Sequence, residues 1–213
     1  MIKVIVAGAA GRMGGRLVSL LRESAALTLA GAVESKGHVT VGEDAGEVAG
    51  CGQPGVVIRD DLSAVMERGE VVIDFSTPAA TLEHLRIAVQ HRRAMVIGTT
   101  GFSAQELAEL RALAKPIPCV FSPNMSVGVN VIFKVIAEMA KTFGEEYDIE
   151  VIEAHHRMKK DAPSGTALKM AEILAKALNR DLEQVGIYAR KGIMGERTRG
   201  EIGIQAIRAG DIV

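Results

Sequence analysis

The 213-residue sequence has little of several features that mark whole classes of protein. Its two cysteines, Cys51 and Cys119, show no C-x-x-C spacing, which argues against a disulfide framework or a zinc site and fits a reducing compartment. Tryptophan is absent, and aromatic residues are limited to five Phe and two Tyr. A formal net charge of -1 provides no broad basic surface, so nucleic acid is not an expected partner.

Long hydrophobic runs are missing as well. No segment approaches the ~18 apolar residues of a membrane span, and the apolar start at residues 2–7 is too short for a signal peptide. The G-x-x-x-x-G-K-[ST] motif is absent, which argues against a nucleoside triphosphatase. Hydrophobic residues still make up 48% of the chain, enough for a sizeable core. We therefore expect a soluble, cytoplasmic protein with a small partner and no membrane contact.

What the sequence does contain begins with a strand, a glycine turn and a helix. The apolar run at residues 2–7 leads into G-A-A-G-R-M-G at residues 8–14 and then into leucines at helical spacing. Such a turn lets the backbone approach a pyrophosphate at a helix N-terminus. A second strand, at residues 27–33, ends at Glu34, whose carboxylate can accept hydrogen bonds from a ribose. Ala10 replaces the second glycine of G-x-G-x-x-G, so the prediction of a dinucleotide site depends on the strands and helix around the motif as well as on the motif itself.

Short strands and helices then alternate up to residue 121. Residues 35–54 are expected to form a long loop or irregular hairpin, and Ser103 with Glu106 predicts a capping box. Further strands are predicted at 56–58, 71–75, 95–97 and 119–121, and a short helix at 61–68. Another helix is predicted to begin at the cap formed by Ser76-Thr77-Pro78 and to end at His91. This alternation predicts a doubly wound parallel sheet, with ligands bound beyond the strand ends. Five residues fall at such ends: Gly8, Glu34, Ser76, Gly98 and Ser122.

The pattern changes after residue 126. A long amphipathic helix is predicted to end near Gly144, followed by a strand at 147–153, a helix at 164–178, a glycine-rich loop at 189–200 and a strand near 202–206. We therefore predict an α/β protein with two domains. The first, at residues 1–126, is a Rossmann-like, dinucleotide-binding domain, and the second, at 127–213, is of α+β type with a mixed or open sheet and carries the candidate reaction centre described next.

The segment E-A-H-H-R-M-K-K-D-A-P-S-G-T-A, residues 153–167, is the candidate reaction centre. Its histidines and lysines can exchange protons or bind a carboxylate, and the predicted helix start offers unpaired backbone N–H groups to an anion. We therefore expect an organic acid as substrate. Two other interpretations are a metal site, disfavoured because adjacent strand histidines point to opposite faces, and a basic, solvated surface.

Together these motifs resemble the dihydrodipicolinate reductase family. The similarity covers essentially the whole chain and rests on A-G-A-A-G-R-M-G, D-F-S-T-P, V-I-G-T-T-G-F, N-M-S-V-G-V-N and, most specifically, the 153–167 segment. It implies an enzyme that uses NADH or NADPH, without a metal, to reduce the cyclic dicarboxylic acid 4-hydroxy-tetrahydrodipicolinate to tetrahydrodipicolinate in the diaminopimelate and lysine pathway. It also implies a homotetramer, with residues 127–213 as the substrate-binding and oligomerisation domain.

The resemblance assigns residues to roles. His155 falls on the family's proton donor/acceptor, and Lys159 on its proton donor. The substrate site corresponds to His156, Ser164, Gly165 and Thr166. The cofactor positions are Gly8, Ala9, Ala10, Gly11, Arg12, Met13, Glu34, Ser35, Lys36, Gly98, Thr99, Thr100, Ser122, Pro123, Asn124 and Met125. Ser35 departs from members that carry an arginine for the 2'-phosphate, so we expect use of both coenzymes, with Arg12 and Lys36 replacing it in part.

Two alternatives and one further expectation accompany this interpretation. A non-catalytic dinucleotide-binding sensor of the same fold is disfavoured by the intact His155 and Lys159. A semialdehyde dehydrogenase is disfavoured because neither cysteine has a histidine beside it in sequence. Family members continue past the final G-D-I-V, so we expect the native chain to be longer by roughly 50 residues, with each domain then near the usual size.

Overall fold

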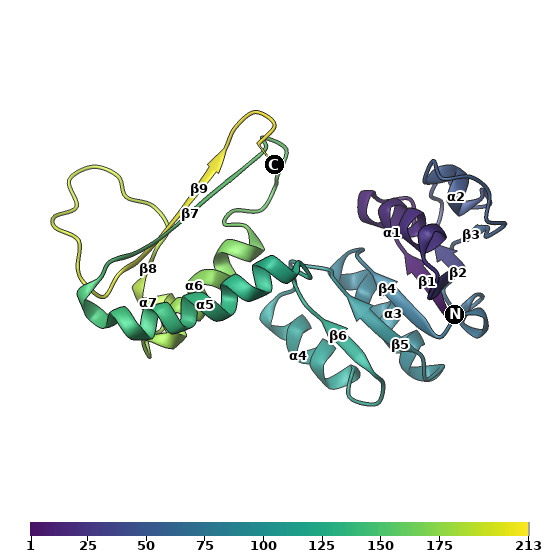
Figure 1. Cartoon of the computed structure of the whole chain (residues 1–213), viewed down its shortest axis with the longest axis horizontal. Coiled ribbons are helices and arrows are strands. Elements are labelled where there is room, and N and C mark those ends of the chain that lie inside the picture. Colours follow the sequence, from purple (N-terminus) through teal and green to yellow (C-terminus); the bar gives the residue numbers. More distant parts are fainter. Residues whose placement is uncertain (213) are drawn as a thin grey trace. The chain divides into compact units, whose positions relative to one another are not determined.

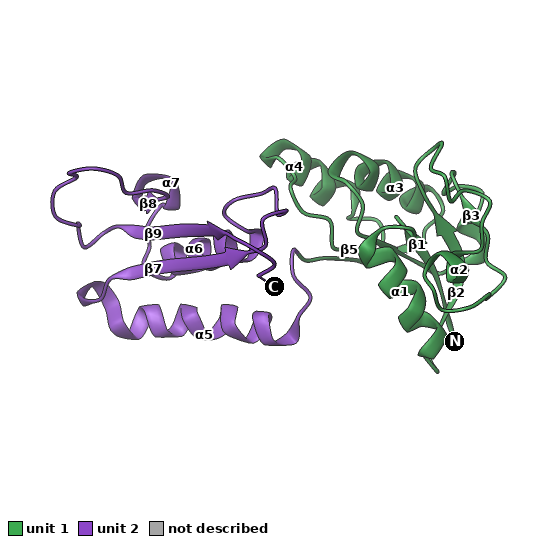
Figure 2. Cartoon of the chain, turned by 90° about the horizontal axis from the view of Figure 1, so that it is seen from above, with its two compact units in different colours: residues 1–122 green, residues 123–213 purple. Residues whose placement is uncertain are grey.

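The computed structural model describes residues 1–212, and the chain divides into two compact units, residues 1–122 and 123–213 (Figure 2). This division lies four residues before the domain boundary expected from the sequence. Each unit has its own sheet and its own buried core.

Unit 1 contains a six-stranded sheet in the order β3-β2-β1-β4-β5-β6, in which all neighbouring strands run parallel (Figure 1). The strands are β1 (Ile2–Ala7), β2 (Leu27–Val33), β3 (Ile58–Arg59), β4 (Val71–Asp74), β5 (Ala94–Ile97) and β6 (Cys119–Phe121). The helices are α1 (Arg12–Glu23), α2 (Ala45–Val48), α3 (Pro78–Gln90) and α4 (Ala104–Leu113), with a 3-10 turn at Met66–Arg68. The predicted Rossmann-like fold is confirmed.

Both faces of this sheet are covered. Along β1, Val4 and Val6 pack in a core with Val18 of α1, whereas Ile5 and Ala7 belong to a second core that includes α3 and α4 residues. Strands buried on both faces appear in a sequence as continuous apolar runs, and this explains the uninterrupted hydrophobic character of residues 2–7. The sheet order reverses between β1 and β4, and ligands of such folds bind outside the strand ends at this point.

Several local predictions for unit 1 were wrong. The 35–54 segment contains a short helix, α2, whose first turn is capped by the Asp44 side chain, which accepts from the N–H groups of Gly46 and Glu47. The predicted helix at 61–68 is reduced to the 3-10 turn. Helix α3 begins with Pro78 as expected, but in the described chain Thr77 makes no side-chain capping bond and Ser76 bonds Asp74 instead. The capping box of Ser103 and Glu106 is confirmed.

Unit 2 has an open, three-stranded parallel sheet in the order β7-β9-β8. Its elements are β7 (Ile149–His155), β8 (Gly186–Ile187), β9 (Ile202–Arg208), α5 (Val127–Phe143), α6 (Gly165–Ala177) and α7 (Leu182–Val185), with a 3-10 turn at Gly144–Glu146. Helix α6 packs on β7 and β9 through alanines, among them Ala171, and α5 packs against α6 (Figure 2). Strand β7 ends two residues later than predicted, so it includes His155.

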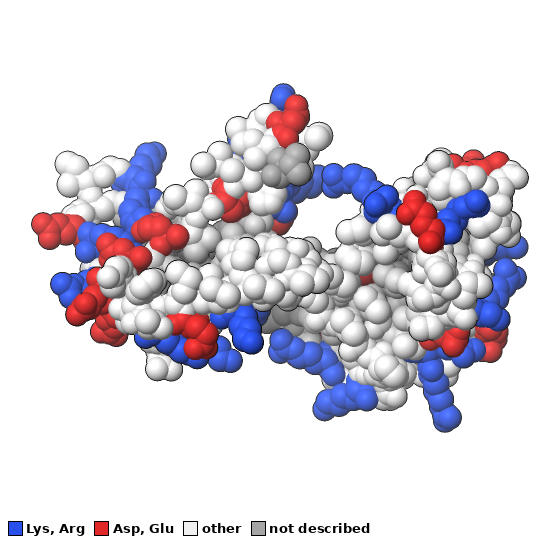
Figure 3. Space-filling model, viewed as in Figure 1, with Lys and Arg blue, Asp and Glu red and all other residues white. Residues whose placement is uncertain are grey.

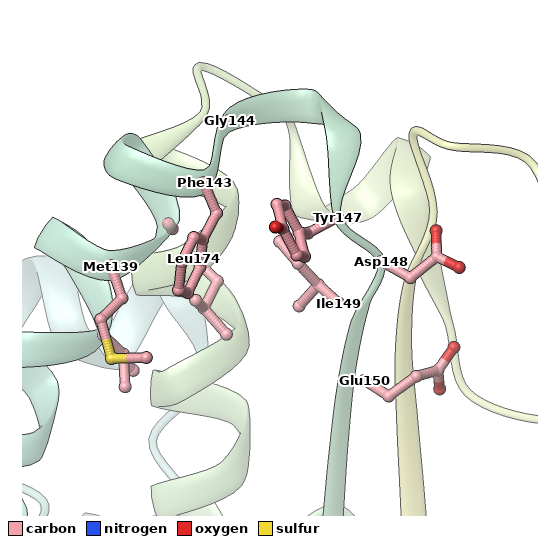
Figure 4. A pocket seen from close by; sticks show the side chains of 10 residues that line it. Met139, Phe143, Gly144, Tyr147, Asp148, Ile149, Glu150 and Leu174 are labelled. Atoms are coloured by element: carbon pink, nitrogen blue, oxygen red, sulfur yellow. The ribbon is translucent and has the colours of Figure 1, made fainter.

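A hollow of about 210 Å³ lies in unit 2 beside the start of β7. Figure 4 shows Met139, Phe143 and Tyr147 around it, while the carboxylates of Asp148 and Glu150 point away from Phe143. It is at the opposite end of β7 from His155, about 20 Å away for seven extended residues. This hollow is therefore separate from the predicted reaction centre.

Charged side chains of both signs are distributed over the face of the molecule seen in Figure 3. Within residues 1–212, none of the helices is long and apolar enough to cross a membrane. On the face seen in Figure 3, each unit carries both acidic and basic side chains, and the part over the first turns of α5 is uncharged. The mixed charges agree with a formal net charge of -1.

Candidate active site

The glycine turn between β1 and α1 brings backbone groups close together. Gly8 has φ +70°, a conformation that residues with a side chain rarely adopt. A Cβ atom on Gly14 would lie 2.0 Å from the Gly8 carbonyl oxygen, so only glycine lets α1 approach the turn this closely. In the described chain no side chain caps α1, whose N-cap is Gly11, and its first N–H groups are therefore available to an anion.

Glu34 lies at the end of β2 and is tied to this turn. Its Oε1 accepts a hydrogen bond from the Ala10 N–H at 3.1 Å, and its Oε2 accepts one from the Ser35 N–H at 3.0 Å. The structure thus brings together the glycine turn and the acidic residue, which the sequence placed about 24 residues apart. Ser35 and Lys36, and Arg12 and Met13 at the start of α1, are exposed. A dinucleotide's pyrophosphate and ribose fit this arrangement of backbone donors and carboxylate.

A buried polar network joins the ends of β4 and β5, and the sequence did not reveal it. The fully buried Asp74 accepts hydrogen bonds from the Ser76 N–H and hydroxyl and is 2.7 Å from Nδ1 of His84. Burial alone would raise the pKa of Asp74, but the bonds from His84 and Ser76 outweigh it, so the pKa lies below its ordinary value. The only signal in the sequence was the D-F-S-T-P motif itself.

Thr99 belongs to the same network. Its hydroxyl lies 2.8 Å from that of Thr81 and 3.5 Å from Asp74, and the residue is 3% exposed. Gly98 is also buried, whereas Thr100 is exposed. The Thr99 side chain thus points into the protein interior. At the carboxyl end of β5, only the backbone of residues 98–100 and the Thr100 side chain remain for a ligand.

In unit 2, the end of β7 carries a buried carboxylate beside His155. Glu153 is 8% exposed and lies 2.7 Å from Nδ1 of His155. It also pairs with Arg208 of β9 and accepts from the Ser164 N–H at 2.8 Å. Arg208 lowers the pKa of Glu153 to about 2, helped by His155 and Ser164 against the opposing effect of burial. The sequence analysis gave no role to Glu153 or Arg208.

The two neighbouring lysines lie in different environments. The Lys159 ammonium is 2.8 Å from a carboxylate oxygen of Asp161, and its side chain is 21% exposed, whereas Lys160 is exposed. Burial would raise the pKa of Asp161, but the bond from Lys159 outweighs it and the pKa is lowered. The loop between β7 and α6 thus holds the Lys159 ammonium through Asp161, and the Lys159 N–H donates to the His156 carbonyl oxygen at 3.2 Å.

The start of α6 lies at the other end of this loop. Ser164 caps the helix by accepting from the Ala167 N–H at 3.2 Å, and Gly165 leaves open space where a side chain would stand. The Thr166 hydroxyl accepts from the Asn124 side chain at 3.1 Å, so a predicted substrate residue touches a predicted cofactor residue within unit 2. The Thr166 hydroxyl keeps its own hydrogen for donation to a ligand.

His156 follows β7 directly. Its Nδ1 is buried and has no hydrogen-bond partner among the described residues. Among residues 1–212, no three His, Cys, Asp or Glu side chains are grouped to hold a metal.

The structure sorts the predicted residues into two sets. The glycine turn, Glu34 to Lys36, Gly98 to Thr100 and Ser122 lie at the strand ends of unit 1, as the parallel sheet requires. The remaining residues lie in unit 2: Pro123, Asn124, Met125, His155, His156, Lys159, Ser164, Gly165 and Thr166. Pro123 and Met125 are exposed.

Comparison with known proteins gives a consistent picture. The family model for dihydrodipicolinate reductase, N-terminus, matches residues 2–125, and that for dihydrodipicolinate reductase, C-terminus, matches residues 128–213. The chain is 54% identical over all its 213 residues, and over 80% of the relative, to 4-hydroxy-tetrahydrodipicolinate reductase of Syntrophus aciditrophicus (strain SB). It is 53% identical, with the same coverage, to the reductase of Syntrophobacter fumaroxidans (strain DSM 10017 / MPOB).

A solved structure is similar as well. The dipicolinate-bound dihydrodipicolinate reductase from Paenisporosarcina sp. TG-14 matches with a TM-score of 0.66 and 26% identity, over 99% of this chain and 79% of that one.

Proposed function

Since the chain belongs to the dihydrodipicolinate reductase family, we propose that it reduces 4-hydroxy-tetrahydrodipicolinate to tetrahydrodipicolinate with a nicotinamide dinucleotide, in the diaminopimelate and lysine pathway. The observation that carries this proposal is the clustering of His155, His156 and Lys159 beside the α6 N-terminus, in a chain whose other unit has the dinucleotide layout. We place the protein in the cytoplasm, where its two unpaired cysteines would stay reduced.

The cofactor would be held by backbone and carboxylate groups of unit 1. Its pyrophosphate would be bound by the N–H groups of Arg12 and Met13 in the first turn of α1, and an adenosine ribose by Glu34. Residues Gly98 to Thr100 and Ser122 to Met125 would complete the site. When bound, the nicotinamide supplies the hydride. Gly14 permits this binding because any side chain there would separate the turn from α1.

The substrate's carboxylates would be bound at the α6 N-terminus. The backbone N–H groups of Gly165 and Thr166, in the first turn of α6, would bind an anion, and the Thr166 hydroxyl can donate while it accepts from Asn124. His156 would be the further substrate residue that the family resemblance implies. These donors match a dicarboxylate, the class represented by the dipicolinate bound in the Paenisporosarcina enzyme.

Lys159 and His155 would donate and accept the protons of the reaction. Loss of the 4-hydroxyl group as water would leave a conjugated intermediate. Addition of a hydride to it then leaves negative charge, which a nearby ammonium neutralises by proton donation. Lys159 is already held in place by Asp161. His155 would return or accept protons through the ring nitrogen that does not face Glu153. Both residues act as acids or bases, and neither needs a metal for this role.

Coenzyme choice depends on the surroundings of Glu34. Its carboxylate favours a free 2'-hydroxyl and repels a 2'-phosphate, whereas the exposed Arg12 and Lys36 attract the phosphate. We therefore propose that the enzyme uses both NADH and NADPH, with specificity constants within about a hundredfold of each other.

The test is a spectrophotometric assay of NADH and NADPH oxidation with freshly made 4-hydroxy-tetrahydrodipicolinate. Turnover with both coenzymes, and inhibition by dipicolinate that competes with the substrate, is the expected result. Binding of NADH without any turnover would instead point to the non-catalytic sensor.

A further inference from the structure

Glu153 and Arg208 form a buried pair that no part of the proposed mechanism uses. Arg208 is the residue of β9 directly opposite His155 in the parallel pairing of β7 with β9. Its Nη1 lies 2.7 Å from Oε2 of Glu153 and its Nη2 lies 2.7 Å from Oε1, which is the two-bond geometry of a fork-shaped guanidinium on a carboxylate. The Glu153 side chain is 7% exposed and that of Arg208 is 19% exposed.

This pair determines which nitrogen of His155 carries a proton. An ionised carboxylate can only accept hydrogen bonds, so Nδ1 of His155 must be the donor in its 2.7 Å contact with Glu153. Nε2 is then the nitrogen that takes up or releases a proton. Because Arg208 keeps Glu153 ionised in spite of its burial, this assignment persists over the pH range in which the enzyme works.

The same pair also holds the two ends of the loop that follows β7. Oε1 of Glu153 accepts from the Ser164 N–H at 2.8 Å, next to the anion-binding start of α6. Nη2 of Arg208 donates to the Asp161 carbonyl oxygen at 2.6 Å, and Asp161 holds the Lys159 ammonium. Glu153 and Arg208 thus contact the residues adjoining both the proton donors and the carboxylate site.

We propose that Glu153 and Arg208 are a positioning pair, which fixes the tautomer of His155 and its orientation relative to Lys159 and the α6 N-terminus. The proposal rests on the proposed function for its effect on turnover, but not for its effect on the imidazole. Neither residue is assigned contact with the substrate. A purely structural pair would stabilise unit 2 without altering the protonation pattern of His155.

The main experiment compares Glu153→Gln with Glu150→Gln in the full chain. Both glutamates lie on β7 and both pair with arginines, Glu150 with Arg190 and Arg197, but Glu150 is at the other end of the strand. We expect Glu153→Gln to lower kcat at least about tenfold, the lower end of the effect of losing a partner that orients a functional imidazole. The KM for NADH should change less than about threefold, and Glu150→Gln should leave kcat within about twofold.

The second readout is the side-chain 15N NMR spectrum of the histidines, with the His155 signals assigned by their loss in His155→Gln. In the unaltered protein above the titration range we expect the proton on Nδ1. In Glu153→Gln we expect a larger share of the form with the proton on Nε2, because the neutral amide can also donate to Nδ1. This readout needs no substrate, so it tests the positioning pair even if the unaltered protein does not turn over.

Arg208 provides an independent variant should Glu153→Gln fail to fold. Arg208→Lys keeps a cation beside Glu153 and should retain more activity than Arg208→Met, which leaves the carboxylate without its main partner. A His155 proton on Nε2 in the unaltered protein would overturn the proposal. So would a folded Glu153→Gln variant with unchanged kcat and an unchanged His155 spectrum.

Discussion

At the scale of single residues, the surroundings of a side chain distinguish it from an identical neighbour. The sequence shows Lys159 and Lys160 side by side, and the structure separates them, because Lys159 is held by Asp161 while Lys160 is exposed. It likewise separates His155, which faces Glu153, from His156, which has a buried nitrogen with no described partner.

Replacement of Lys159 tests the assigned proton donor. Lys159→Met should lower kcat by at least about a hundredfold, as expected for loss of a general acid, with NADH binding unchanged. Lys160→Met is the matched control and should have a much smaller effect. Steady-state kinetics together with NADH titration would measure both, and near-normal turnover of Lys159→Met would contradict the assignment.

The lowered pKa of Glu153 predicts that the folded protein loses stability in acid. Its pKa in the folded protein is about 2, below the ordinary value of 4.5, chiefly because of the hydrogen bonds from Arg208. A group with a depressed pKa stabilises the fold fully above its ordinary pKa, and this contribution is lost as the pH falls from about 4.5 to about 2.

The measurement is the difference in thermal unfolding midpoint between the unaltered chain and Glu153→Gln. This difference should be constant above pH 5 and shrink steadily between about pH 4.5 and pH 2. Glu145→Gln, which alters an exposed carboxylate of unit 2, provides the control and should show a small difference. A Glu153→Gln difference that stays constant in acid would contradict the prediction.

At the scale of elements, the sequence predicted those parts of the fold whose signals are local. The strand at 2–7 is apolar throughout, the capping box of Ser103 and Glu106 is a local pattern, and Gly144 ends α5 with φ +66°. The failures involve tertiary contacts: α2 is supported by Asp44 and by pairing of Asp44 with Val57, and Glu153 is joined to Arg208 from 55 residues away. No periodicity in one segment could reveal these partners.

Helix α1 offers two adjacent glycines with opposite expected outcomes. Gly14→Ala places a Cβ atom 2.0 Å from the Gly8 carbonyl oxygen, so α1 must move away from the turn. We expect loss of NADH binding by at least about tenfold and lower stability. Gly15→Ala meets its nearest atoms, in Ala49, at 3.9 Å and should stabilise the helix by up to about 1 kcal/mol.

Fluorescence titration of NADH and thermal unfolding of both variants would test this contrast. Equal behaviour of the two variants would mean that the close approach of α1 to the turn does not shape the cofactor site.

At the scale of the whole molecule, the exposed apolar side chains of α5 indicate self-association. Val131, Val135, Met139 and Phe143 are each between 46% and 55% exposed along this helix. Contiguous apolar surface of this kind usually marks an interface. We expect a homotetramer, the state implied by the resemblance described above.

Light scattering coupled to size-exclusion chromatography would measure the oligomeric state. The expected mass is about four times that of the 22.6 kDa chain. Val135→Glu should lower it by placing a charge on this surface, whereas Lys134→Glu, on the same helix, should affect it less. A monomer at all concentrations would contradict the prediction.

The parallel pairing of β7 with β9 has a consequence for the order in which a nascent chain can fold. Every strand of unit 1 has been made once Phe121 leaves the ribosome, but His155 has no strand beside it until Arg208 has followed. At about 5 to 20 residues per second, that interval of 87 residues lasts roughly 4 to 17 seconds. Unit 1 can therefore complete its sheet during translation, while Glu153 has no arginine partner until Arg208, the last residue of this interval, has been added.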